Sequence, residues 1–177
     1  LNKDEFVEVH PPNPLSLGKV RVAKTVLESI IISVPKLKPH REAVVTLSLK
    51  NMMGALASKG IMHMGLSLSK NIVDLASVLK PSIAVIDGII ASEGDELGGN
   101  PIEMNLVIAG TDPVAVDTVG TAVMGIEPTE VKHLVLAEKK GLGTSNLNKI
   151  TILGENIEKV RRKFNRSLSS RLLVYLG

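Results

Sequence analysis

The stretch Val34-Pro35-Lys36-Leu37-Lys38-Pro39-His40-Arg41 separates an apolar run from a helical pattern, and the rest of the chain is organised around it. The run before it, residues 30–34, is continuous and rich in β-branched side chains, which is typical of a strand buried on both faces. The prolines of the stretch end this strand, and residues 42–57 then predict a helix. A strand, a basic turn and a helix in this order can hold an anion. We therefore expect Lys36, Lys38 and His40 to belong to an anion-binding site.

Two more continuous apolar runs predict buried strands, at residues 82–86 and 105–109. A carboxylate follows each of them: Asp87 comes directly after the first strand, and Asp112 follows the second. Open α/β sheets bind their ligands at the carboxyl ends of the strands, which makes both residues candidates for the same site. Because the three strands alternate with helical patterns, we expect an α/β fold with a three-layer, mostly parallel open sheet flanked by helices.

The chain is long enough for one domain with a real core, so we expect residues 1–177 to form a single α/β domain that is a fragment of a longer chain. The remaining patterns predict helices over residues 67–79, 113–126, 128–140 and 155–164, and a last strand over residues 150–153. The apolar residues 172–176 are expected to pack on this domain or on a partner segment.

One charged side chain interrupts the helical pattern that follows the basic stretch. Between residues 43 and 58 the sole charge is Lys50, which lies four residues after Thr46 and therefore on the same face of a helix, with Asn51 beside it. An ammonium group in such a segment either reaches outward to water or faces a site. We expect Lys50 and Asn51 to bind a ligand, and an exposed lysine is the alternative.

A single carboxylate lies in the next helical pattern, among Val, Ala, Gly and Met side chains. Asp112 and Pro113 are a typical helix start, so capping alone could explain Asp112. From Pro113 to Ile126 the only charged residue is Asp117, and burying an unpaired carboxylate costs several kcal/mol. We expect Asp117 to line the site as a catalytic residue, and a bond to a backbone donor is the alternative.

The composition excludes several classes of function. Aromatic residues make up only 2% of the chain, which argues against the stacking platforms of single-stranded nucleic-acid binding. The net charge is +3 and the basic residues form no long run, so a local anion site fits better than a nucleic-acid interface. The chain has no cysteine, which excludes an iron–sulfur cluster within it. No apolar stretch is long enough to span a membrane, and we expect a cytoplasmic protein.

A glycine-rich acidic loop is predicted after the second strand, over residues 91–103. Carboxylates beside glycines could hold a hard divalent cation. Their spacing matches no EF-hand, so a solvated loop is the alternative, and we assign no metal ligands.

Four blocks of this sequence, in order, resemble the signature of the DUF362 family. They are residues 34–40 continued by residues 45–54, Ala84-Val-Ile-Asp-Gly88 with Glu93-Gly94, Gly110-Thr-Asp-Pro-Val-Ala-Val-Asp117, and Met124-Gly125. The resemblance covers roughly residues 20–140, with Pro39 where the family usually has threonine. It implies a fold and a list of site residues rather than an activity, since the function of the family is undefined. It also implies that this chain is the C-terminal part of a longer domain, and that an iron–sulfur ferredoxin-like module accompanies many members, which suggests redox work by association.

Residues and resemblance together predict a DUF362-like domain that binds a small anionic ligand at the carboxyl ends of its strands, as part of a redox-linked enzyme. The predicted catalytic residues are Asp117, Asp87 and His40, and the predicted ligand-binding residues are Lys36, Lys38, Lys50, Asn51 and Asp112. The alternative is a non-catalytic binding or scaffold domain that docks an acidic or iron–sulfur partner protein. A third interpretation leaves the basic turn solvated and the carboxylates as caps and structural pairs. Neither nucleic acid nor membrane is an expected partner, and the sequence identifies no cofactor.

Overall fold

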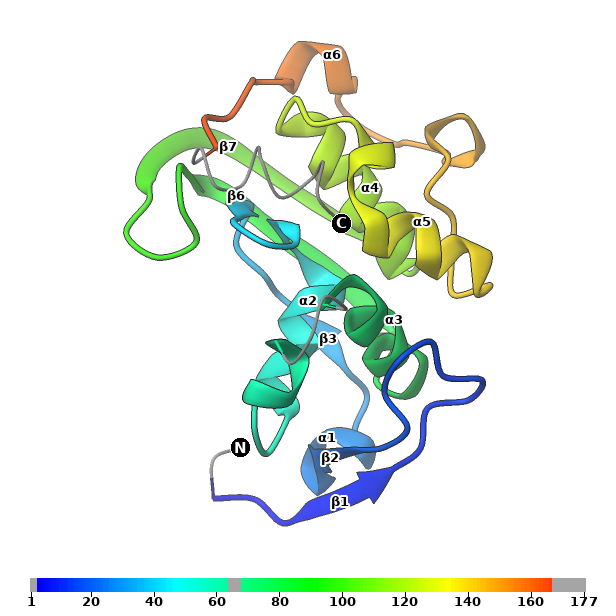
Figure 1. Cartoon of the computed structure of the whole chain (residues 1–177). Helices are drawn as coiled ribbons and strands as arrows, with labels where there is room; N and C mark the ends of the chain where they lie inside the picture. The colour runs from blue at the N-terminus through cyan, green and yellow to red at the C-terminus, as the bar shows by residue number, and fades with distance from the viewer. Residues whose placement is uncertain (1–2, 64–67, 167–177) are drawn as a thin grey trace.

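Helices and strands are mixed along the chain in the computed structural model, which describes residues 3–63 and 68–166 (Figure 1). The strands are β1 (Phe6–Val9), β2 (Val20–Ala23), β3 (Ile32–Ser33), β4 (Lys38–His40), β5 (Val44–Thr46), β6 (Ile83–Glu93) and β7 (Asn100–Gly110). The helices are α1 (Lys24–Leu27), α2 (Ser48–Asn51), α3 (Leu68–Val78), α4 (Pro113–Val123), α5 (Lys132–Lys139) and α6 (Ile157–Val160), with 3₁₀ turns at Met52–Ala55, Gly60–His63, Pro128–Glu130 and Leu147–Lys149. The predicted mixture of helices and strands is confirmed, whereas the predicted packing of residues 172–176 falls outside the described residues.

The longest strands, β6 and β7, form an antiparallel hairpin that runs across the molecule (Figure 1). Residues 94–99, which include Asp95 and Glu96, make its turn, where Gly94 and Gly98 have φ angles of 98° and 75°, a conformation that glycine adopts without steric cost. The strands predicted over residues 82–86 and 105–109 are correct in position. An antiparallel hairpin joins them, and its strands take up both ends of the loop predicted over residues 91–103, of which only residues 94–99 form the turn.

Strand pairing in the described part of the chain is mainly antiparallel. β1 pairs with β2, and β4 with β5, in antiparallel two-stranded sheets, while β3 joins β6 as a parallel neighbour in a mixed sheet of order β3-β6-β7. The predicted mostly parallel open sheet is therefore not confirmed. Parallel strands need a crossover of about a dozen residues or more, and the short glycine turn between β6 and β7 leaves no room for one.

The basic stretch is itself largely extended. It first runs beside β6, where Leu37 N donates to Asp87 O and Asp87 N donates to Pro35 O, each at 2.8 Å, and it then forms β4. Only α2 and a 3₁₀ turn remain of the helix predicted over residues 42–57. The β-branched side chains of residues 44–46 favour a strand over a helix, and they pair with β4 as β5.

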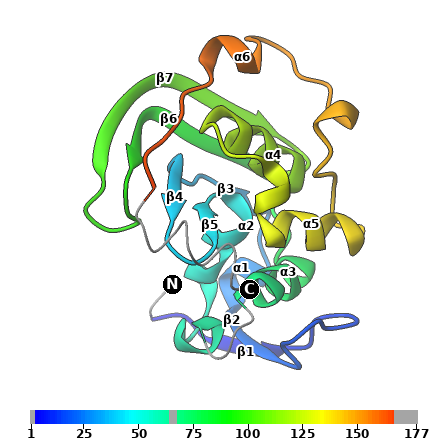
Figure 2. The same ribbon diagram turned by 45° about the horizontal axis from the view of Figure 1, so that its top comes forward.

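Helix α4 lies against the β6–β7 hairpin, and nearly all of its residues are buried (Figure 2). Gly120 permits this close approach, because a Cβ there would lie 2.7 Å from Ile86 Cδ1. The helix start predicted at Asp112 and Pro113 is correct, and α3 and α5 fall within their predicted ranges. Helix α6 is shorter than predicted, and the strand predicted over residues 150–153 has no ladder partner among the described residues.

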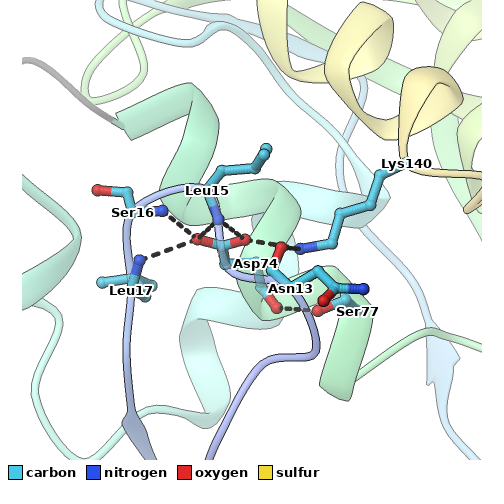
Figure 3. Close-up of polar contacts among 7 residues, drawn as sticks. All are labelled: Asn13, Leu15, Ser16, Leu17, Asp74, Ser77 and Lys140. Atoms are coloured by element: carbon cyan, nitrogen blue, oxygen red, sulfur yellow. Dashed lines mark hydrogen bonds and ion pairs between the residues drawn. The ribbon is translucent and has the colours of Figure 1, made fainter.

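A buried carboxylate, Asp74 in α3, ties the N-terminal loop to two helices (Figure 3). It accepts hydrogen bonds from the backbone nitrogens of residues 15–17 at 2.7–2.9 Å and from the Lys140 ammonium at 2.8 Å. Burial opposes its ionisation, yet these donors together hold the pKa of Asp74 below its usual value. Since Lys140 directly follows α5, this contact fixes α5 against α3.

Candidate functional site

Lys36 and Asp87, which we expected to bring opposite charges to one site, bind each other near the surface. Lys36 Nζ donates to Asp87 Oδ2, and the two side chains are 42% and 36% exposed. The hydrogen bond from Lys36 holds the pKa of Asp87 below its usual value, and Ile89 N donates to the same carboxylate at 3.1 Å. An exposed pair of this kind neutralises both charges and leaves little to attract a ligand.

Asp117 is completely buried in α4 and binds the start of α2. Its Oδ1 accepts a hydrogen bond from Ser48 N at 2.7 Å, and its Oδ2 accepts one from Leu49 N at 2.8 Å. Burial raises the pKa of Asp117 to about 7, although the two backbone donors act in the opposite direction. The carboxylate therefore faces backbone rather than water, and it fixes the short helix that carries Lys50.

Asp112 accepts hydrogen bonds from two separate segments of backbone. Its Oδ1 caps α4 by accepting from Val114 N at 2.9 Å and Ala115 N at 3.1 Å, and its Oδ2 accepts from Thr144 N at 3.0 Å. The second segment approaches so closely that a Cβ on Gly143 would lie 2.0 Å from Asp112 Oδ1. Asp112 thus joins the start of α4 to the loop that follows α5.

Asn51 is the neighbour of Lys50 in α2, and its side chain binds the sheet. Asn51 Nδ2 donates to Ser33 Oγ at 3.2 Å, and Ser33 Oγ in turn donates to the backbone oxygen of Ser48 at 3.4 Å. These bonds link α2 to β3. They account for Asn51 without a ligand.

Strands β4 and β5 pair with each other, and α2 follows β5 directly (Figure 2). These elements carry three basic side chains, Lys38, His40 and Lys50, which we call the basic cluster. The Lys38 ammonium donates to the backbone oxygen of Glu96 at 3.0 Å, while the Glu96 carboxylate pairs with Arg41 at 3.2 Å. Within the part of the chain that the structure describes, Lys38 forms no ion pair. Its positive charge is therefore available to a ligand.

Lys50 is half-buried, and its ammonium group forms no hydrogen bond or ion pair with any residue in 3–63 or 68–166. Burial lowers the pKa of Lys50, and the charge of Lys38 adds to this effect, while the carboxylates of Glu96 and Glu42 oppose it. An ammonium group removed from water without a counter-charge is costly. This makes Lys50 the residue of the cluster that would gain most from an anion.

The orientation of the buried His40 ring follows from its hydrogen bonds. His40 Nδ1 lies 3.1 Å from Glu42 N and 3.1 Å from Ala43 N, both of which are donors. A ring nitrogen that accepts carries no proton, so the neutral ring has its proton on Nε2. His40 Nε2 is then the hydrogen-bond donor of this side chain.

His133, in α5, was not identified from the sequence. The side chain is completely buried, and neither ring nitrogen has a hydrogen-bond partner among the described residues. Burial lowers the pKa of His133 to about 3, and positive charge on Lys50 and on His40 acts in the same direction. Its spacing is that of an ordinary core position, four residues before the buried Ala137, so the sequence gives no signal that separates it from the core.

The same described residues show neither a metal-binding cluster nor a membrane-spanning helix. They contain no group of three or more His, Cys, Asp or Glu side chains that could hold a metal ion, and a divalent cation at the acidic loop stays a prediction. None of their helices has both the length and the apolar character needed to cross a membrane.

Comparisons with known proteins give a family and a distant relative. The family described as "Domain of unknown function (DUF362)" matches residues 1–122, which does not support the expectation that this chain is a C-terminal part. The Thylakoid-associated protein sll1697 of Synechocystis sp. is 29% identical over 136 residues, which make up 72% of this chain and 42% of that relative. This chain therefore spans less than half of the relative's length. No solved structure matches it.

Proposed function

This chain belongs to the DUF362 family, whose function is unknown, and we propose that it binds a small anionic ligand through the basic cluster. The observation that carries the proposal is the Lys50 ammonium, which is half-buried and has no partner among the described residues. Lys38 supports it, since its ammonium meets a carbonyl oxygen rather than a carboxylate. Lysines bind phosphate and carboxylate groups as point charges, so an oxyanion on a small molecule is the ligand class that fits.

The remaining predicted residues take different parts in this proposal. Asp117 would position Lys50 by holding α2, and His40 would shape the turn between β4 and β5 through its contacts with Glu42 N and Ala43 N. Lys36, Asp87, Asn51 and Asp112 would act only on the surrounding structure. The predicted redox-linked reaction and the cytoplasmic location stay predictions, because they rest on the family resemblance and on composition.

Titration with inorganic phosphate, sulfate and acetate, followed by backbone amide NMR shifts, tests the proposal. Removing one charge-assisted contact should weaken binding by about tenfold to a hundredfold, and we expect this for Lys50→Ala and Lys38→Ala. Lys132→Ala is the matched control, since Lys132 is exposed on α5. Equal affinities of the Lys50→Ala and Lys132→Ala proteins would overturn the proposal.

The alternative function, docking of an acidic or iron–sulfur partner protein, rests on one observation. Arg41 is 55% exposed beside the cluster and could reach a flat protein surface, which the half-buried Lys50 could not do as readily. Such a complex would weaken steeply with salt, because exposed charges are screened. Loss of a complex in Arg41→Ala but not in Lys50→Ala would favour docking over small-ligand binding.

A further inference from the structure

A groove of about 630 Å³ lies between β7, α4 and the segment that precedes α6. Residues 104–110 of β7 and residues 150–155 line it, together with Val116, Val119 and Val123 of α4. Pockets of this size with mainly apolar walls and a few polar groups are typical of binding sites. None of the residues of the basic cluster lines this groove.

Strand β7 is the edge of its sheet, since it pairs with β6 and with no other strand in the part of the chain that is described (Figure 1). Every second residue of such a strand points its N–H and C=O groups away from the sheet, where a further strand could pair with them. A bulge at Asn105, whose φ angle is 51°, interrupts β7. The regular part of the edge along the groove is therefore residues 106–110.

The segment on the other side of the groove also has unpaired backbone groups. Residues 150–153 were predicted to form a strand, and Ile150 has the extended φ and ψ angles of −99° and 119°. Residues 151–155 form no backbone hydrogen bond in the described chain, with β7 or with any other element. The side chain of Leu153 is 90% exposed there. Apolar surface of this kind beside a groove is typical of a contact site.

Unpaired backbone groups on β7 and on residues 151–155 favour a peptide as the occupant of the groove. An aliphatic chain would fill the space but leave these donors and acceptors without partners, whereas an extended peptide pairs with them. Because residues 150–155 line the same groove as β7, a single strand fits between them, and the edge of a second sheet does not.

The side chains that line the groove indicate the composition of this peptide. The valines of α4 favour aliphatic side chains on every second position, which point to one face of a strand. The lining includes the carboxylates of Asp112 and Glu155 and no Lys, Arg or His, so basic residues complement its charge. We infer that β7 and residues 150–155 bind an extended peptide of a partner protein, in which aliphatic side chains alternate and basic residues flank them.

A labelled seven-residue peptide of alternating valine and threonine, with a lysine at each end, is the probe for the full chain. Its methylated analogue, which lacks the N–H donors along one edge, should bind at least about tenfold more weakly, because hydrogen bonds are lost while the side chains stay. An analogue with glutamate ends should bind at least about threefold more weakly. The parent peptide should slow hydrogen exchange at alternate amides of residues 106–110 and at residues 151–153.

Two exposed leucines give a matched pair of variants. Leu153→Ser removes the apolar side chain beside the groove and should weaken binding of the parent peptide by about tenfold. Leu97→Ser is the control, because Leu97 is 82% exposed in the turn of the hairpin and does not line the groove. Lys50→Ala should bind the peptide like the wild-type protein, so this site and the proposed anion site are tested separately.

Several results would overturn the inference. These are equal affinities for the parent and methylated peptides, equal affinities of the Leu153→Ser and Leu97→Ser proteins, and no binding of the parent peptide. Octyl glucoside that slows exchange at residues 106–110 when the peptide does not would assign the groove to an aliphatic ligand instead. Slowed exchange at the same amides that increases with protein concentration, without peptide, would assign it to a second copy of the chain.

Discussion

The Asp117 carboxylate lies 2.7 Å from the backbone nitrogen of Ser48, a residue 69 positions earlier in the chain. With the neighbouring bond to Leu49 N, it lets α4 hold the first turn of α2, and α2 carries the Lys50 ammonium. A side chain with the sequence pattern of a catalytic group thus acts on the candidate site through another element. In the proposed site, Asp117 would therefore act as a positioning residue.

Stability should depend on pH through Asp117. The folded-state pKa of about 7 is raised above the ordinary value of 3.8, so the contribution to stability is complete below pH ~4 and is lost as the pH rises to about 7. Asp117→Asn cannot titrate. We therefore expect its free energy of unfolding, relative to wild type, to improve by about 3 kcal/mol between pH 5 and pH 8. Urea unfolding at the two pH values measures this, and a constant difference would contradict a protonatable buried carboxyl.

Asp117→Leu is the companion variant, because leucine fills a similar volume without an acceptor. It should leave Ser48 N and Leu49 N buried and unpaired, which costs about 1–3 kcal/mol for each. We expect α2 to loosen, with faster hydrogen exchange at these two amides than in the wild-type protein. Unchanged exchange would show that other contacts hold α2.

The Asp74–Lys140 pair should be worth far more than a surface ion pair. Lys140→Met leaves the completely buried Asp74 carboxylate without its cation, and we expect a loss of about 3 kcal/mol in the free energy of unfolding. Because the pKa of Asp74 is lowered on folding, its contribution is present above pH ~4 and is lost as the pH falls further, so acid unfolding should begin at a higher pH in the variant. Lys139→Met, on an exposed neighbour, is the control; equal losses in the two variants would contradict this account.

Gly143 should be intolerant of even one added carbon. A Cβ there would lie 2.0 Å from Asp112 Oδ1, so Gly143→Ala must displace either the cap of α4 or the bond to Thr144 N. We expect a loss of about 1–3 kcal/mol, which thermal unfolding measures. Gly18→Ala is the matched control, since nothing lies within 4 Å of a Cβ at that position. A wild-type melting temperature for Gly143→Ala would be inconsistent with the described loop.

The Lys36–Asp87 pair should matter neither for stability nor for binding. Both side chains are more than one-third exposed, and salt screens such pairs. A double-mutant cycle of Lys36→Ala and Asp87→Ala should give no measurable coupling at physiological salt. Lys36→Ala should also bind oxyanions like the wild-type protein, in contrast to Lys50→Ala. Weakened binding would return Lys36 to the site that the sequence predicted for it.

Short-range signals in the sequence were sufficient for several elements of the fold. The Asp112-Pro113 start of α4 and the apolar periodicity of α3 and α5 depend on neighbours within a few turns, and each was predicted in place. The hairpin was not predicted, because glycines such as Gly94 and Gly98 are equally typical of a tight turn and of an irregular loop.

Long-range partners explain what the sequence could not predict about the site. The donors for Asp117 come from a segment 69 residues away, and no local pattern identifies them. His133 has the spacing of an ordinary core position in an amphipathic helix, and only its burial without partners among the described residues distinguishes it. Lys50 was identified because it is the sole charge in its segment.

The hydrogen bond between Asp117 and Ser48 has a consequence for the folding rate of the protein. Like the bonds of Asp74 to Leu15 and of Lys36 to Asp87, it closes a loop of more than fifty residues. Chains rich in such distant contacts fold in about milliseconds to seconds, because the entropy of loop closure is lost before the contacts compensate for it. Because Asp117 in α4 holds the start of α2, we expect Lys50 to reach its final place only after α4 has docked, so the proposed anion site would form late in folding.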